Sequence, residues 1–233
     1  MSFAAEWAKW SNAQSVTAVS TFGAKAGLSA YGQPRPVYNF QPDQFLGTWF
    51  EVIHNEGVSK EQGDGLCITA EYSGNADGSI AVKNSFQKGE FVKKGNQRIV
   101  TGDLTDRMGV PAVARCQTPW GACFVEFFGQ GSETPNYNVI GTDYENWAIT
   151  YDPTRKTGEE LVWVLSRTPQ LPKEFVPVVF KTLQEKLPNF NPALWDTLTY
   201  QGKECDYAGQ GFIYSNRNDA PWLRAKLMAL FLY

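Results

Sequence analysis

The most informative stretch of this chain is Phe45-Leu46-Gly47-Thr48-Trp49-Phe50-Glu51-Val52-Ile53-His54. Gly47 allows a sharp turn of the backbone at no steric cost, because glycine lacks a Cβ atom. The residues after it are mostly aromatic or β-branched, which is typical of a strand. A Gly-Thr-Trp triplet recurs by chance, and Trp49 alone would be an ordinary core residue. The stretch by itself therefore predicts a strand that begins abruptly at a turn.

Two later stretches each follow a strand-like run directly. Thr142-Asp143-Tyr144 follows the strand-like run 137–140, and Arg167 directly follows the strand-like run 161–166. An aspartate in a turn commonly accepts backbone N–H bonds, so Asp143 needs no catalytic role. The chain after Arg167 has the pattern of a helix.

The composition fits a β domain with a large apolar interior. Of 233 residues, 42% are hydrophobic and 14% are aromatic, which suits either a packed core or a cavity for an apolar ligand. The formal net charge of −3 gives no general attraction to nucleic acid or to an anionic membrane. The sequence contains no run of about 18 apolar residues that could span a bilayer.

Four cysteines stand at positions 67, 116, 123 and 205, and none belongs to a C-x-x-C pair. With His54 as the sole histidine, a Cys/His zinc site is not expected. The even number favours two disulfides and an oxidising compartment; a cytosolic protein with reduced thiols is the alternative. The first residues lack the pattern of a signal peptide, so we expect a mature, secreted chain whose leader was removed and whose start Met was supplied.

The middle of the chain predicts an all-β fold of eight antiparallel strands. No helix is apparent between them, and the longer segment 105–121 carries no predicted strand. Turn residues separate several of the strands, which favours an up-and-down barrel, although a sandwich fits the same pattern. The strands are expected at residues 48–55, 66–73, 79–87, 97–104, 122–128, 136–143, 146–151 and 160–167.

One amphipathic helix is predicted after the last strand, over residues 171–187. Pro177 places the start of the regular helix close to itself, because proline is tolerated only in the first turn. We expect the helix to pack on the outside of the barrel through apolar residues at helical spacing, namely Phe175, Val178, Val179 and Leu183, with Phe180 beside them.

Three regions follow from this pattern: an N-terminal extension (1–38), a barrel with its helix (39–205) and a C-terminal extension (206–233). The first is expected to lie on the barrel as an arm. The apolar run 221–233 resembles a helix, and we expect it to dock on its own barrel. A second copy of the chain or a membrane surface is the alternative partner for this run.

Taken together, Gly47-Thr48-Trp49, Thr142-Asp143-Tyr144 and Arg167, followed by a helix, resemble the signature of the lipocalin family. The likeness covers roughly residues 39–205. Residues 65–73, 77–84 and 162–169 further resemble the apolipoprotein D and bacterial lipocalin branch. The resemblance implies a closed eight-stranded barrel, the lipocalin calyx, and selects it over a sandwich.

In lipocalins the arginine lies across the tryptophan and seals one end of the barrel. Carried over to this chain, the resemblance implies structural roles for Gly47, Trp49, Asp143 and Arg167. A guanidinium over an indole contributes roughly 1–2 kcal/mol when it is shielded from water. We therefore expect Trp49 and Arg167 to hold the fold rather than to catalyse a reaction.

The resemblance also implies the pairing of the cysteines. In this branch the cysteine of the second strand bridges to one after the helix, which corresponds to Cys67 and Cys205. The other bridge of the branch has no counterpart here. Instead, Cys116 and Cys123 flank the turn-like loop 118–121 and could form a local disulfide.

A ligand pocket is implied by the same resemblance, formed by Tyr72, Asn84, Phe127 and Trp163. Side chains alternate along a strand, which adds Ile68, Ala70, Ile80, Val82, Val125 and Leu165 to the inner face. This apolar set with a few polar atoms suits a hydrophobic ligand, whereas the alternative is a solid barrel filled by side chains. An amide such as that of Asn84 costs a few kcal/mol in apolar surroundings unless it is hydrogen-bonded, which favours a ligand or water beside it.

We therefore expect a carrier of one small hydrophobic molecule: a fatty acid, retinoid, sterol, carotenoid or bilin. No cofactor is required beyond such a bound molecule. The alternative is an enzyme of the lipocalin fold that acts on a hydrophobic substrate in the same cavity. No catalytic constellation is apparent, and Glu51 and Glu71 have the pattern of ordinary strand residues.

Overall fold

The computed structural model describes residues 33–62, 65–87, 90–94, 97–101, 107–153, 160–187, 197–202, 205 and 207. The predicted docking of residues 221–233 lies outside these residues, as does most of both extensions. The described end of the N-terminal extension lies on the barrel, because the Val37 N–H donates to the Val139 carbonyl at 2.8 Å.

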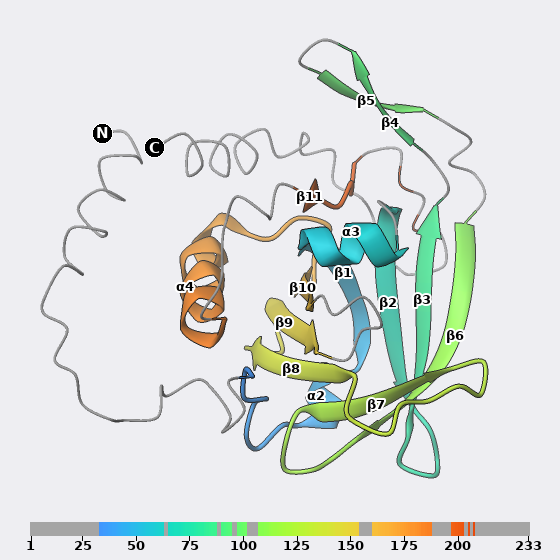
Figure 1. Cartoon of the computed structure of the whole chain (residues 1–233), viewed down its shortest axis with the longest axis vertical. Coiled ribbons are helices and arrows are strands. Elements are labelled where there is room, and N and C mark those ends of the chain that lie inside the picture. The colour runs from blue at the N-terminus through green and yellow to red at the C-terminus, as the bar shows by residue number, and fades with distance from the viewer. Residues whose placement is uncertain are drawn as a thin grey trace, which may run out of the picture.

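Eight strands form a closed antiparallel barrel, which confirms the predicted fold (Figure 1). Each strand pairs with its neighbour in the chain, and the last pairs back with the first, so that Phe50 lies opposite Ser166 and His54 opposite Trp163. The barrel strands are β1 (Gly47–His54), β2 (Leu66–Gly74), β3 (Ile80–Gln87), β6 (Arg107–Cys116), β7 (Ala122–Phe127), β8 (Tyr137–Thr142), β9 (Trp147–Asp152) and β10 (Leu161–Ser166).

The fourth barrel strand is β6, and the prediction that residues 97–104 form it was wrong. Residues Gln97–Thr101 do form a strand, β5, but it pairs with β4 (Glu90–Lys94) in a separate two-stranded sheet. Figure 1 shows this hairpin projecting beyond the ends of β3 and β6. Strand β6 was missed because Gly109 and Pro111 lie inside it, and both residue types are depleted from the interiors of central strands.

The expectation of no helix between the barrel strands was also wrong. Helix α3 (Glu56–Gln62) follows β1 directly, and Asn55 accepts the N–H of Val58 at its start. Val58 is buried with residues of the barrel interior, so α3 covers the end of the barrel at which β1 stops. A helix of seven residues is too short to show a helical period in the sequence.

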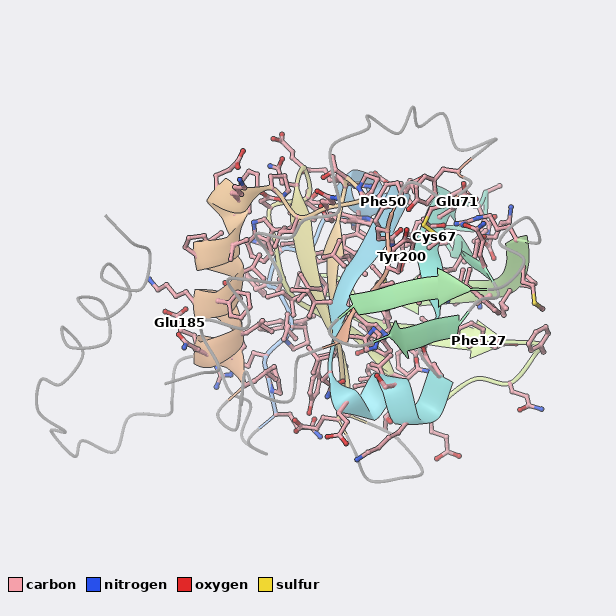
Figure 2. All side chains as sticks on the ribbon, turned by 90° about the horizontal axis from the view of Figure 1, so that it is seen from above. Phe50, Cys67, Glu71, Phe127, Glu185 and Tyr200 are labelled. Atoms are coloured by element: carbon pink, nitrogen blue, oxygen red, sulfur yellow. A yellow bond between two sulfur atoms is a disulfide. The ribbon has the colours of Figure 1, made fainter. Side chains whose placement is uncertain are left out.

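The predicted outer helix is present. After the turn η1 (Lys173–Phe175), helix α4 (Val176–Lys186) begins with Pro177 in its first turn, as expected. Figure 1 shows α4 beside the barrel. In Figure 2 its labelled residue Glu185 lies on the opposite side of the molecule from Phe127.

Helix α4 contacts the barrel through Val176, Val179, Phe180 and Leu183, which are buried. The prediction that Val178 belongs to this face was wrong, because its side chain is exposed. Gly141 in β8 permits the close approach, since a Cβ atom there would lie 2.8 Å from Cγ2 of Thr182.

Side-chain alternation divides the apolar residues into two clusters. In β10, Leu161, Trp163 and Leu165 face the barrel interior, whereas Val162 and Val164 face the outer cluster that includes α4. Both faces of the strand are thereby buried. This explains why β10 reads as a continuous apolar run rather than an alternating one.

A short strand, β11 (Thr197–Leu198), pairs with the last two residues of β1, Ile53 and His54. Tyr200, two residues after β11, forms an isolated bridge to Leu66. The disulfide Cys67–Cys205 fixes this segment to β2, and Cys116–Cys123 joins β6 to β7. Both disulfides form as expected.

One end of the barrel is sealed by Arg167. Its guanidinium carbon lies 3.7 Å from the centre of the Trp49 ring, and Trp49 is fully buried. The guanidinium donates to the carbonyl oxygens of four residues at 2.9–3.1 Å: Gln44, Leu46, Thr48 and Tyr144. Gly47 has a φ of +95°, and a Cβ atom there would lie 3.2 Å from Nη1 of the arginine.

The turn after β8 is capped by Asp143, as predicted. Its Oδ1 accepts the backbone N–H groups of Asn146 and Trp147 at 2.8 and 3.0 Å. These bonds account for the carboxylate without any role in catalysis.

Replacing Arg167 by alanine should lower the free energy of unfolding by about 3 kcal/mol, because the substitution removes the stacking on Trp49 and leaves carbonyl oxygens without their charged donor. Urea unfolding measures the effect. The matched control is Arg115→Ala, whose exposed ion pair with Asp77 should contribute less than about 1 kcal/mol. Equal effects of the two substitutions would contradict this role for Arg167.

Removing the disulfides should show an order set by loop length. The Cys67–Cys205 bridge spans 138 residues and the Cys116–Cys123 bridge spans 7, which corresponds to about 5 and about 2 kcal/mol on the chain-entropy model. The variant Cys67→Ala/Cys205→Ala should therefore lose more stability in urea than Cys116→Ala/Cys123→Ala. The reverse order would show that native contacts rather than chain entropy dominate.

Candidate functional site

The barrel encloses a cavity of about 670 Å³. Its wall is contributed by most of the barrel strands, by Gln62 at the end of α3 and by Gly65 before β2. The interior is therefore hollow, and the alternative of a barrel filled by side chains is wrong. The cavity lies on the α3 side of the sealing pair Trp49 and Arg167.

The structure brings the nine predicted ligand-binding residues together around this cavity. They come from four strands: β2, β3, β7 and β10. Ile80, which alternation also placed on the inner face, packs in the interior cluster but does not line the cavity. The nine lining residues are Tyr72, Asn84, Phe127, Trp163, Ile68, Ala70, Val82, Val125 and Leu165.

Asn84 is a polar group in this wall whose amide makes no hydrogen bond among the described residues. It lies in β3 opposite Ala70 and Val110, both of which line the cavity. The amide of Asn136, in contrast, already has partners. It accepts the Val125 N–H at 2.7 Å and donates to the Val125 carbonyl at 3.0 Å. Asn84 is thus available to a molecule in the cavity.

Two tyrosine hydroxyls meet at the cavity wall. The hydroxyl oxygens of Tyr72 and Tyr137 lie 2.7 Å apart, and both side chains line the cavity. Burial, and then the neighbouring Tyr137, raise the pKa of Tyr72 well above its usual value. Burial also raises the pKa of Tyr137 to about 12, with a smaller contribution from the negative charge of Glu51.

Glu51 is the main residue that sequence reasoning missed. It lines the cavity and is 5% exposed, although its pattern in the sequence was that of an ordinary strand residue. Its Oε1 accepts the Thr199 hydroxyl at 2.6 Å and lies 2.7 Å from Nδ1 of His54. The available signal was its spacing of two from Trp49, which places both side chains on the inner face.

Tyr137 and Thr150 were missed for a similar reason. Both line the cavity, but each lies in a strand whose inner face was not assigned from the sequence. The Thr150 hydroxyl lies near enough to Tyr137 to oppose the rise of its pKa, yet it makes no hydrogen bond of good geometry. Alternation from a known inner residue in β8 or β9 would have identified both.

The described part of the chain shows no group of three or more His, Cys, Asp or Glu side chains that could hold a metal ion. Nor does any helix in that part have the length and apolar character needed to cross a membrane. The chemistry offered by the described cavity residues is thus apolar contact plus a few hydrogen-bonding groups.

A hollow eight-stranded barrel, sealed at one end by an arginine stacked on a tryptophan and flanked by one outer helix, is the architecture of a lipocalin. A family model described as a lipocalin-like domain matches residues 41–187, which is more than half of the chain. The protein belongs to the lipocalin family.

Its relatives belong to the branch that the sequence motifs indicated. Apolipoprotein D of Bos taurus is 33% identical over 163 residues, covering 66% of this chain and 77% of that protein. The outer membrane lipoprotein Blc of Vibrio cholerae is 33% identical over 140 residues, covering 58% and 69%. The structure of insecticyanin from the tobacco hornworm Manduca sexta has the same fold, with a TM-score of 0.56 at 21% identity over 75% of this chain and 88% of that one.

The buried tyrosine pair should make the fold sensitive to alkali. A tyrosine whose pKa is raised in the folded state stays neutral where the unfolded chain already ionises, so its stabilising contribution is lost as the pH rises. We expect the free energy of unfolding to fall between about pH 10 and pH 12, the ordinary and the raised pKa of Tyr137.

Urea unfolding at a series of pH values measures this decline. Tyr137→Phe should make it shallower, because one ionising group is removed. The control Tyr38→Phe, at a side chain that is 59% exposed, should leave it as it is. A decline that is unchanged in Tyr137→Phe would contradict this account.

Proposed function

We propose that this lipocalin binds and carries one small hydrophobic molecule in its barrel cavity. The observation that supports the proposal is the hollow interior. Its volume of about 670 Å³ falls within the range of about 300–1,000 Å³ that is typical of ligand pockets. Moving apolar ligand surface out of water into this wall contributes about 25 cal/mol per Å².

In this proposal the apolar residues of the wall contact the body of the ligand. The rings of Phe127 and Trp163 provide the largest apolar surfaces, and the free amide of Asn84 orients a polar atom. The other proposed contacts are Tyr72, Ile68, Ala70, Val82, Val125 and Leu165. A fatty acid, retinoid, sterol, carotenoid or bilin has the required apolar body, and the relationship to a protein named apolipoprotein D supports an association with lipid.

Carriage is favoured over catalysis by the contacts of His54, which lies behind the cavity wall. Nδ1 of His54 lies 2.7 Å from Glu51, and Nε2 lies 3.0 Å from the Ser59 hydroxyl. Both ring nitrogens thus have partners in the protein, and the histidine presents no free base to a substrate. The two disulfides fit secretion into an oxidising compartment, which is part of the proposal.

Filling the cavity should abolish binding. Ala70 lines the cavity, whereas the next residue of β2, Glu71, pairs with Lys83 outside it. We expect Ala70→Phe to weaken the binding of a retinol probe at least tenfold, because the new ring occupies the space of the ligand. Quenching of the intrinsic tryptophan fluorescence, to which Trp163 contributes from the cavity wall, measures the affinity.

Glu71→Phe is the matched control, since it adds the same ring on the opposite face of the same strand. It should keep the affinity of the original protein. If no hydrophobic probe changes the fluorescence, and native mass spectrometry of protein purified from its source finds no bound molecule, the proposed function is wrong.

A further inference from the structure

Glu51 places a carboxylate in the wall of an otherwise largely apolar cavity. It lies in β1 opposite Leu165 of β10, two residues after Trp49 of the sealed end, and is 5% exposed. Burying a carboxylate costs free energy unless it is hydrogen-bonded or paired. The partners of each oxygen therefore show which one is available to a ligand.

The two side-chain hydrogen bonds of this carboxylate both fall on one oxygen. Oε1 accepts the Thr199 hydroxyl at 2.6 Å and lies 2.7 Å from Nδ1 of His54. Among the described residues no group bonds Oε2, which is left to the cavity. Gln201 donates to the Glu51 carbonyl at 2.8 Å, so the backbone is held as well as the side chain.

His54 fixes Glu51 rather than facing the cavity itself. It is 1% exposed, does not line the cavity, and has its second ring nitrogen 3.0 Å from the Ser59 hydroxyl in α3. Thr199 and His54 thus hold Oε1 on the side away from the cavity, and Ser59 of α3 holds His54 in turn. We infer that Oε2 faces the cavity, which Glu51 lines. An ionised carboxylate oxygen can only accept hydrogen bonds.

The charged residues around the cavity also favour a ligand group that donates hydrogen bonds to Glu51. None of the described residues that line it is a lysine or an arginine, so these residues offer no positive partner to the carboxylate of a ligand. Next to Glu51 it would meet a like charge, which is unfavourable. An ammonium or hydroxyl group would instead donate to Oε2.

We propose, building on the carrier function above, that Glu51 binds the polar end of the ligand through Oε2. The ligand is accordingly an apolar molecule that ends in a hydrogen-bond donor without negative charge, an amine or an alcohol. Thr150, whose buried hydroxyl makes no hydrogen bond of good geometry, lies in the same cavity wall and offers a second contact. The inference narrows the ligand class by excluding free carboxylic acids from this end of the cavity.

A matched series tests the inference: decylamine, decanol and decanoate, which share one apolar chain and differ in the end group. Displacement of the neutral probe N-phenyl-1-naphthylamine at neutral pH gives the three affinities. We expect the amine and the alcohol to bind about tenfold or more tightly than decanoate, the size expected for a hydrogen bond to a charged group.

The variant Glu51→Gln keeps the shape of the side chain but replaces a carboxylate oxygen, an acceptor, by an NH₂ donor. If its amide oxygen retains the Thr199 and His54 contacts, its NH₂ group faces the cavity as a donor. Decylamine should then bind about tenfold more weakly than to the original protein, and decanoate more tightly. The control Glu71→Gln, on the outer face of β2, should leave the order of the three ligands unchanged.

The outcomes separate this inference from the carrier function. If decanoate binds the original protein as tightly as the amine and the alcohol, the role of Glu51 is wrong and the carrier function stands. If none of the three ligands displaces the probe, and the probe itself does not bind, the carrier function fails. The series on the original protein is decisive even where circular dichroism shows that Glu51→Gln does not fold.

Discussion

The stacking of the Arg167 guanidinium on the Trp49 indole, 3.7 Å apart, is the contact on which the rest of the structure depends. The arginine also ties the turn before β1 to the loop after β8 through backbone carbonyls. It thereby closes one end of the barrel with a charged group that is satisfied and held in place. The cavity lies beyond this sealed end, on the side of α3.

The hollow interior is compatible with a stable fold because much of the apolar packing lies outside the barrel. Strands β9 and β10 are buried on both faces, one toward the cavity and the other toward α4. The outer cluster includes both cysteines of the longer disulfide. Much of the apolar packing therefore lies outside the cavity, and the inner wall also carries polar groups such as Glu51.

How much could be predicted from the sequence varies with the range of the interaction. The family resemblance implied four residues of the cavity wall. Strand alternation, which is local, then added five more that line the cavity: Ile68, Ala70, Val82, Val125 and Leu165. Strand β6 was missed because Pro111 contradicts the local preference for a strand, and pairing with β3 and β7 overrides that preference. The spacing of Glu51 from Trp49 could have placed it on the inner face. Its hydrogen bond with Thr199, 148 residues later in the chain, could not be read from a local pattern.

The bridge between Cys67 and Cys205 has a topological effect beyond its contribution to folding. It encloses seven of the eight barrel strands, together with α4, within a single covalent ring of the chain. A protease that cuts once anywhere inside that ring, for example in the projecting β4–β5 hairpin, does not release a fragment. The nicked molecule keeps its mass apart from one added water, and its pieces separate only when a reductant opens the bridge and the fold is lost.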